Sequence, residues 1–176
     1  MHRSIMICAV TGVIAGFTAT AAAQVGRDGL DQGARAKTGV APAAAGACSP
    51  NKIAYKTSDV SVNMSSNVFA VVPQTLVAFT QGGASPSCVI VRYSAMAAAQ
   101  ESWIPLRVVL DGSVIAEPGV ISYEGETEII GISLARSFDF VFPAVAPGAH
   151  RVRVDWRSFR STIIYMHRRT IIVQHR

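Results

Sequence analysis

From Cys48 to the last residue, the apolar residues of this chain come in short runs that alternate with polar ones. The clearest run is 151–157 (RVRVDWR), whose two valines and Trp156 fall on one side of an extended chain and whose charged residues fall on the other. Roughly eight to ten such segments follow one another between Gly- and Pro-containing turns, and no long amphipathic helix pattern interrupts them. This pattern predicts an all-β fold, an antiparallel β-sandwich or barrel.

Local signals support the strand assignment. Asp111-Gly112 between two apolar runs is typical of a tight hairpin turn, because both central positions of such a turn need a positive φ. The three phenylalanines of 137–142 (SFDFVF) share one face of a predicted strand. Residues 95–100 (AMAAAQ) have helical propensity and predict either a single helical turn or a loop that crosses the domain.

The first 23 residues have the order of a secretory signal peptide: a basic start, an apolar run, and then the small residues Ala21-Ala22-Ala23. The alternative is an uncleaved membrane anchor, for which the run is short and diluted by glycine and threonine. Residues 24–47 are rich in Gly and Ala, which predicts a flexible, disordered linker. We therefore expect a signal peptide (1–23), a linker (24–47) and a β-sandwich domain (48–176). The mature protein would be periplasmic or secreted and would have no membrane span.

Two cysteines, Cys48 and Cys88, remain after the signal peptide, which contains the third. They lie in no CxxC motif and have no histidine nearby in the sequence, so a redox or metal site is the weaker interpretation. An oxidising compartment favours a structural disulfide between them. Such a bond would close a loop of about forty residues and contribute roughly 4 kcal/mol in the chain-entropy model.

The C-terminal end is basic: residues 151–176 hold seven arginines and one aspartate, in a chain of formal net charge +5. Guanidinium groups bind phosphate, sulfate and carboxylate with paired hydrogen bonds, so a cluster of them predicts an anion-binding face. The alternative is a solvated outer face of the sandwich. The residues that we expect in the binding face are Arg151, Arg153, Arg157, Arg160, Arg168 and Arg169.

The basic charge and the predicted export together indicate which partners to expect. The anions outside the inner membrane are lipopolysaccharide, acidic glycans and acidic protein surfaces, including an envelope protein or a second copy of the chain. Nucleic acid is not expected, because the chain is exported and aromatic residues do not alternate with the arginines in the sequence.

Other chemistry finds little support in the sequence. No G-x-S-x-G motif marks a hydrolase nucleophile. His167 and His175 are eight residues apart and would share one face of an unbroken strand, but the arginines around them would repel a metal cation. His150 is the remaining histidine of the domain. We expect no catalytic residue, no metal and no cofactor.

Two further features have alternative interpretations. Glu124, Glu126 and Glu128 alternate, so they would either hold Ca²⁺ on one face or belong to a charged, solvated loop or edge strand that discourages strand pairing. Trp156 falls on the valine face and is predicted to lie in the core. Trp103, near the start of a strand, is the better candidate for an exposed ring.

The segment 147–157 (PGAHRVRVDWR), followed by 168–173 (RRTIIV), resembles the closing strands of small jelly-roll domains. Such domains occur in phage tail and fibre proteins, in bacterial secreted proteins and, in broader form, in C1q/TNF heads. The shared elements are a P-G-x-H turn, an alternating strand ending in V-x-W-R, a short hairpin and a final R-x-I-x-V strand. The resemblance implies a jelly-roll sandwich and self-association, and it implies no chemistry.

Together these patterns predict an exported, non-catalytic structural or interaction module that assembles with itself or with a partner. The alternative function is a binding module that recognises anionic glycans or lipid head groups through the C-terminal arginines.

Overall fold

The computed structural model describes residues 48–99, 102–123 and 133–176. These residues form strands and loops without a helix, so no described segment is a helix that could cross a membrane. The predicted signal peptide (1–23), the linker (24–47) and the three glutamates of 124–128 lie outside the described residues. The strands are β1 (Lys52–Ser58), β2 (Val62–Met64), β3 (Ala70–Val71), β4 (Val77–Gln81), β5 (Ser87–Ala99), β6 (Ile104–Leu110), β7 (Val114–Ile115), β8 (Ile121–Tyr123), β9 (Leu134–Val145), β10 (Gly148–Trp156) and β11 (Ile164–His175).

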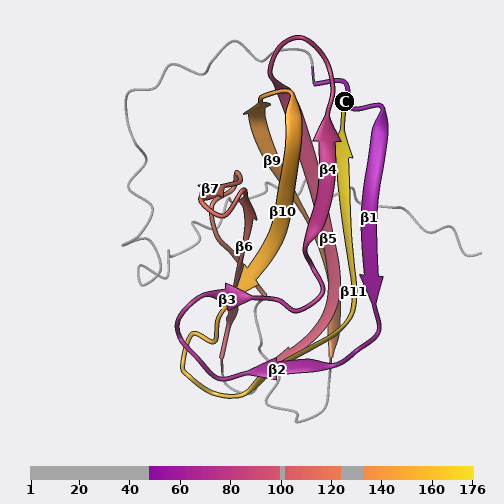
Figure 1. Cartoon of the computed structure of the whole chain (residues 1–176). Helices are drawn as coiled ribbons and strands as arrows, with labels where there is room; N and C mark the ends of the chain where they lie inside the picture. Colours follow the sequence, from indigo (N-terminus) through magenta and orange to yellow (C-terminus); the bar gives the residue numbers. More distant parts are fainter. Residues whose placement is uncertain (1–47, 100–101, 124–132) are drawn as a thin grey trace, which may run out of the picture. The chain divides into compact units, whose positions relative to one another are not determined.

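The strands form two antiparallel sheets with a hydrophobic core between them (Figure 1). Sheet A has the order β1-β11-β5-β9, and β2 follows β1 along the same side of β11. Sheet B has the order β3-β10-β6-β7, with β4 also beside β10 and β8 also beside β6. The predicted antiparallel β-sandwich is therefore confirmed.

The strand pairs are nested along the sequence. β6 pairs with β7 and β8, β5 pairs with β9, β3 and β4 pair with β10, and β1 and β2 pair with β11. Each pair encloses the one before it, and successive pairs alternate between the two sheets. The chain therefore resembles one long two-stranded ribbon that is wrapped into two layers, with its first and last strands side by side (Figure 1).

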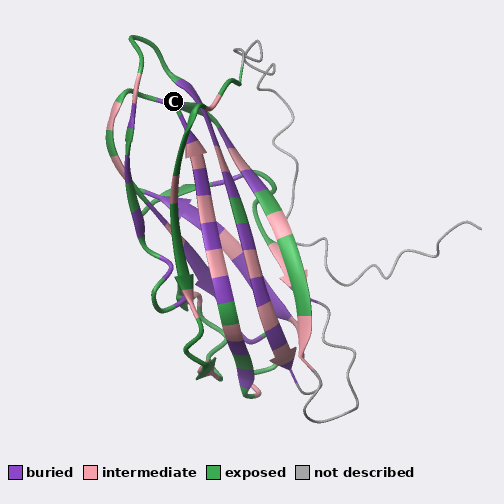
Figure 2. Cartoon of the chain, turned by 90° about the vertical axis from the view of Figure 1, so that its right-hand side faces the viewer, coloured by how far each residue is buried: buried purple, intermediate pink, exposed green. Residues whose placement is uncertain are grey.

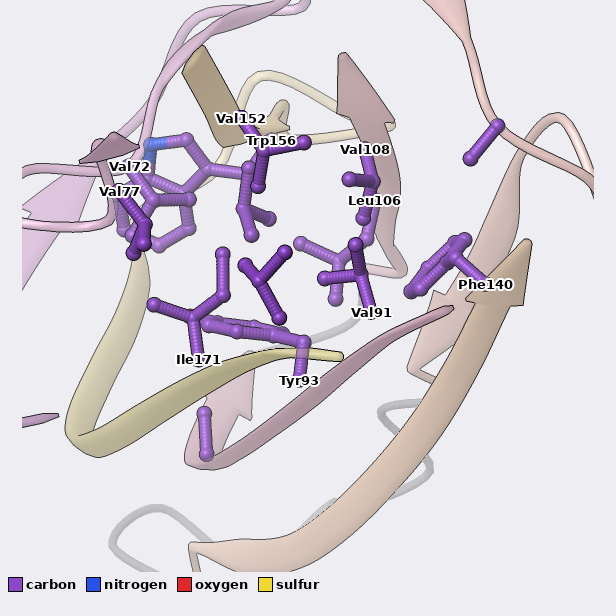
Figure 3. Packing of buried hydrophobic residues seen from close by; sticks show 14 of the residues in the cluster. Val72, Val77, Val91, Tyr93, Leu106, Val108, Phe140, Val152, Trp156 and Ile171 are labelled. Atoms are coloured by element: carbon purple, nitrogen blue, oxygen red, sulfur yellow. The ribbon is translucent and has the colours of Figure 1, made fainter. Parts of the chain in front are cut away.

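The core consists of the inward-facing half of each alternating strand. Along β5 and β11, buried positions alternate with partly exposed ones, whereas β1 is mostly exposed (Figure 2). Trp156 is 2% exposed and lies beside Val72 and Val77, which confirms its predicted place in the core (Figure 3). Tyr93 and Ile171 fill the side of the core that sheet A provides (Figure 3).

The prediction of a helical turn or crossing loop at 95–100 is wrong for residues 95–99. Ala95, Ala97 and Ala99 continue β5 and point inward, each at most 5% exposed. The segment pairs on one side with β11 and on the other with β9. Two ladders of backbone hydrogen bonds outweigh the helical preference of alanine, which is worth only a few tenths of a kcal/mol per residue.

Two local predictions are confirmed. Asp111 and Gly112 have φ values of 50° and 83°, and the Ser113 N–H donates to the Leu110 carbonyl, which closes the turn between β6 and β7. Cys48 and Cys88 form a disulfide, with their Cα atoms 5.3 Å apart. The bond joins the segment before β1 to the start of β5, the two strands that flank the end of β11.

Candidate functional site

The centre of sheet B carries the predicted arginine strand. β10 lies between β6 on one side and β3 and β4 on the other. Its inward residues Val152, Val154 and Trp156 are buried in the core. Because side chains alternate along a strand, Arg151, Arg153, Asp155 and Arg157 point outward, at a spacing of about 7 Å from each to the next.

Asp155 faces outward, but only 2% of it is exposed, because arginines cover it. Arg153 donates from Nε to Asp155 Oδ1 at 2.8 Å. Arg107, the register partner of Asp155 on β6, donates from Nε and Nη2 to Asp155 Oδ2 at 3.2 and 3.1 Å. Each carboxylate oxygen is thus satisfied by a different arginine, and the buried charge is compensated.

Arg107 is a member of this surface that the sequence interpretation missed. The signal was present, since Arg107 is the only charged residue in the apolar run of β6. An arginine within such a strand indicates an outward position beside a partner. The partner itself depends on the register between β6 and β10, which the sequence does not reveal.

Phe69 adds an aromatic ring to the same surface. The Arg107 and Arg157 Cζ atoms lie 4.3 and 5.0 Å from the centroid of this ring, within cation–π range. Arg157 also donates from Nη1 to the Asn67 carbonyl at 3.4 Å. We call the four residues Arg107, Arg151, Arg153 and Arg157 the arginine face.

The remaining predicted arginines do not join this face. Arg160 lies exposed in the loop after β10, and its backbone N–H donates to Ser102 Oγ at 3.2 Å. Arg168 and Arg169 belong to β11 and therefore to sheet A. Arg169 is 2% exposed and donates to the Met166 carbonyl and to Ser58 Oγ, so it is not available at the surface.

A bulge in β11 explains the positions of Arg168 and Arg169. The register shifts between His167 and Thr170, and Arg168 has a φ of 48°. An extra residue in a strand reverses the inward and outward alternation beyond it. His175 is consequently buried on the core side, whereas the partly exposed His167 precedes the bulge, so an unbroken face carrying both histidines does not form. The described residues contain no group of three or more His, Cys, Asp or Glu that could hold a metal ion.

A shallow hollow of about 440 Å³ lies at the start of β10, beside Arg151. Residues from β4, the β6–β7 turn and β10 line it. The side chain of Arg151 makes no hydrogen bond or ion pair with any other described residue, so its guanidinium is free to bind. The outward-facing residues of the hollow are Ala78, Thr80, Ala149 and Arg151.

The far wall of this hollow is an ion pair between His150 and Asp111. His150 Nδ1 lies 2.7 Å from Asp111 Oδ2, and Nε2 lies 2.8 Å from the Ala146 carbonyl oxygen. Both ring nitrogens face acceptors, which is the arrangement that a protonated imidazolium satisfies. Asp111 Oδ1 accepts the Arg151 backbone N–H at 2.8 Å.

These contacts shift the pKa values of both groups. Burial by itself lowers the pKa of His150, but the hydrogen bonds to Asp111 and Ala146 and the charge of Asp111 outweigh it and raise that pKa above 6.5. For Asp111, burial acts to raise the pKa, while the hydrogen bonds from His150 and from the Arg151 N–H lower it below 3.8. The pair is therefore ionised at mildly acidic pH.

Trp103 lies towards the opposite end of β10. It is partly buried, and its ring stacks against Phe159, with centroids 5.0 Å apart and ring planes inclined by 32°. The Phe159 N–H donates to the Trp103 carbonyl at 3.1 Å. The exposed ring surface at this end thus comes from Phe159, which is 43% exposed, more than from Trp103.

Comparison with known proteins adds no family. No protein-family model and no curated protein matches the chain. Among solved structures, the Cry4Aa toxin from Bacillus thuringiensis matches 58% of this chain and 18% of its own at 9% identity, with a TM-score of 0.35. A family GH115 4-O-methyl-alpha-glucuronidase matches 68% and 16% at 14% identity, with a TM-score of 0.35. A family two carbohydrate esterase from Cellvibrio japonicus matches 68% and 34% at 19% identity, with a TM-score of 0.27. The chain thus corresponds to about a third or less of each of these proteins.

Proposed function

We propose that this protein is an exported, non-catalytic β-sandwich module that binds an anionic glycan on the arginine face. The nested strand pairing supports the further description of the sandwich as a jelly roll, in which one long antiparallel ribbon wraps into two sheets. The disulfide is in keeping with an oxidising compartment outside the cytoplasm.

One observation carries the proposed binding function. Four arginines gather on the outer side of sheet B, and Asp155 is the carboxylate with which two of them pair. Arg151 has no partner among the described side chains, and Arg153 uses only Nε for Asp155. Free guanidinium nitrogens are therefore presented in a row along a rigid strand, which suits a polymer with regularly placed sulfate or carboxylate groups.

The aromatic ring of Phe69 favours a glycan over an isolated anion. A guanidinium stacked on an aromatic ring presents its N–H donors at fixed positions, which suits the regularly placed charged groups of a polymer more than a single mobile anion. Arg107 and Arg157 remain fixed against this ring and need little ordering when a ligand arrives.

The test is salt-dependent retention of the mature protein on immobilised heparin, a sulfated glycan. The double variant Arg151→Gln/Arg157→Gln removes two cations from the face and leaves Asp155 paired. Each charge-assisted contact is worth roughly 1.5 kcal/mol, so we expect affinity to fall by more than tenfold. The variant should elute at a clearly lower salt concentration than the unchanged protein.

The matched control is Arg136→Gln/Arg168→Gln, which removes two exposed cations from the strands of sheet A. It changes the net charge equally and should shift elution much less. Equal shifts in the two variants would mean that retention depends only on net charge and would overturn the proposal. Sedimentation with anionic phospholipid vesicles is a separate arm, since stronger binding there than to heparin would identify lipid head groups as the ligand.

Self-association is a second candidate function, and β1 supports it. This strand is at an edge of sheet A, and its side chains Ile53 and Tyr55 are 66% and 70% exposed. Exposed apolar side chains at a sheet edge are suited to pairing with another copy. Light scattering should detect a dimer or trimer that Tyr55→Glu weakens, whereas a strict monomer at high concentration would exclude this function.

A further inference from the structure

The hollow at the start of β10 differs in chemistry from the rest of the arginine face. The face is cationic and apolar, whereas the hollow combines a cation, a carboxylate, a hydroxyl group and apolar walls. Its volume of about 440 Å³ falls within the range of small-molecule sites. We propose that this hollow is an end site that binds one acidic sugar unit, with its carboxylate on Arg151 and its hydroxyl groups on Asp111 and Thr80. The inference rests on the proposed glycan-binding function and adds a specific ligand group to it.

The cationic part of the site is preformed. The Arg151 guanidinium has no partner among the described residues, so a ligand carboxylate would not displace an existing bond. The backbone of Arg151 is fixed by two hydrogen bonds to Asp111: its N–H donates to Asp111 Oδ1 at 2.8 Å, and its carbonyl accepts the Asp111 N–H at 2.8 Å. Paired hydrogen bonds from a guanidinium to a planar carboxylate are the strongest contact that this hollow can offer.

The anionic part of the site excludes simple anions. Asp111 is held by His150 and by the Arg151 N–H, one donor on each oxygen. A carboxylate has about four lone-pair positions, so each oxygen can accept one further hydrogen bond from a hydroxyl group. A free sulfate ion is fully deprotonated, has no such donor to offer and would be repelled, whereas a sugar acid carries both a carboxylate and neighbouring hydroxyls.

The walls suit a sugar ring. Ala78 and Ala149 are small, outward-facing residues beside Arg151, and they leave room for a ring above the sheet. The methyl groups of Ala78 and Ala149 therefore form the apolar floor of the hollow, whereas the Phe79 side chain is 7% exposed and belongs to the core, where it packs against His150 at a centroid distance of 5.6 Å. Thr80 is exposed, and its side-chain hydroxyl forms no hydrogen bond with another described residue, so the hydroxyl is available to a ligand.

The position of the hollow suggests the end of a chain. It lies where β10 begins, at one end of the row formed by Arg151, Arg153 and Arg157. A glycan lying along this row would place its terminal unit in the hollow, because the Asp111 carboxylate opposes the passage of further anionic units beyond it.

The test measures binding of free glucuronate to the mature protein by saturation-transfer NMR. We expect glucuronate to bind, glucose to bind at least tenfold more weakly, and inorganic sulfate at the same concentration not to compete. Arg151→Gln and Thr80→Val should each weaken glucuronate binding, the first by about tenfold, the effect of losing one charged contact of about 1.4 kcal/mol. Arg136→Gln, on sheet A, should leave it unchanged.

The outcomes separate this inference from the proposed function. Glucuronate binding that Arg151→Gln leaves intact, or that sulfate displaces, would overturn the end site. Heparin retention that depends on Arg157 without any glucuronate binding would also reject the end site while supporting the arginine face. If glucuronate still bound but heparin retention no longer depended on the arginine face, the end site would be supported and the proposed function of the face would be rejected. Arg151→Gln should melt at an unchanged temperature, since its guanidinium has no partner in the described chain.

Discussion

The burial of Asp155 depends on contacts that the alternation of polar and apolar residues in the sequence cannot predict. The period of two in the sequence of β10 correctly predicts the face on which Asp155 lies. It does not predict burial, because burial comes from Arg107, which the pairing of β6 with β10 brings beside Asp155. The same period places Arg151, Arg153 and Arg157 together, but the positions of Arg168 and Arg169 depend on a bulge that no residue type in the segment indicates.

Replacing Asp155 by asparagine should change stability and binding in opposite directions. Arg107 and Arg153 would lose the carboxylate that satisfies them, and we expect the free energy of unfolding to fall by about 1–3 kcal/mol in urea titrations. The face would gain one net positive charge, so heparin retention should increase.

Asp139→Asn is the control for this prediction. It removes the carboxylate of an ion pair with Arg92 on sheet A, where both side chains are about half exposed. An exposed pair is worth no more than about 1 kcal/mol, so the loss of stability should be smaller than for Asp155→Asn. Equal losses in the two variants would contradict the structural role given to Asp155.

We expect the His150–Asp111 pair to stabilise the fold only within a limited range of pH. The pKa of His150 is raised, so its contribution is complete below 6.5 and is lost as the pH rises through the higher folded pKa. The pKa of Asp111 is lowered, so its contribution is complete above 3.8 and is lost as the pH falls through the lower folded pKa. The pair therefore stabilises most between these two values.

Melting of the unchanged protein and of His150→Gln across pH measures this window. Because Asp111 is 45% exposed, the difference in Tm should be only a few degrees, and it should be largest near pH 5. It should shrink as the pH rises above the folded pKa of His150. A difference that stays constant from pH 5 to pH 9 would indicate that the histidine ring stabilises by packing against Phe79 and not by its charge.

At the scale of elements, β5 ends in a segment whose sequence is not typical of a strand. Its last residues have a helical preference, and only their position between β9 and β11 makes them extended. Strands with strong alternation, such as β10, could be predicted from the sequence because their pattern and their environment agree. For β5 the two disagree, and the environment could not be predicted from the sequence of the segment alone.

The small side chains of β5 predict a steric limit. Ala97 is 5% exposed and faces the core, whereas its neighbour Ala98 lies on the outer side of the strand. Ala97→Leu should lower the free energy of unfolding by about 1–3 kcal/mol through overpacking. Ala98→Leu, with the same added volume, should change it by less than about 0.5 kcal/mol in the same urea titration, as expected for a surface site. A larger loss of stability for Ala98→Leu than for Ala97→Leu would mean that Ala98, and not Ala97, faces the core.

At the scale of the whole molecule, the outermost strand pair closes the sandwich. β11 is held between β1 and β5, and Gln174 pairs with Ile53 on one side and with Ile90 on the other. The disulfide between Cys48 and Cys88 joins these two flanking strands at the same end. The even pair of cysteines predicted this bond, but its location across the last strand follows only from the nested pairing of the chain.

Reduction of this disulfide tests how strongly the closure stabilises the fold. The two cysteines are 40 residues apart, and the loop between them contains β1 to β4, which supply edge strands to both sheets. In the chain-entropy model, such a loop contributes about 4 kcal/mol, because the cross-link restricts the unfolded chain. We therefore expect a reductant to lower the Tm of the protein by on the order of 10 °C.

The double variant Cys48→Ser/Cys88→Ser supplies the matched comparison. It should melt close to the reduced protein and should not respond to the reductant, because both lack the same cross-link. Thiol labelling of the denatured, unreduced protein should find Cys48 and Cys88 unreactive. Two reactive thiols, or an unchanged Tm after reduction, would mean that hydrogen bonding and core packing alone hold β1 beside β11, and the argument for an oxidising compartment would lose its support.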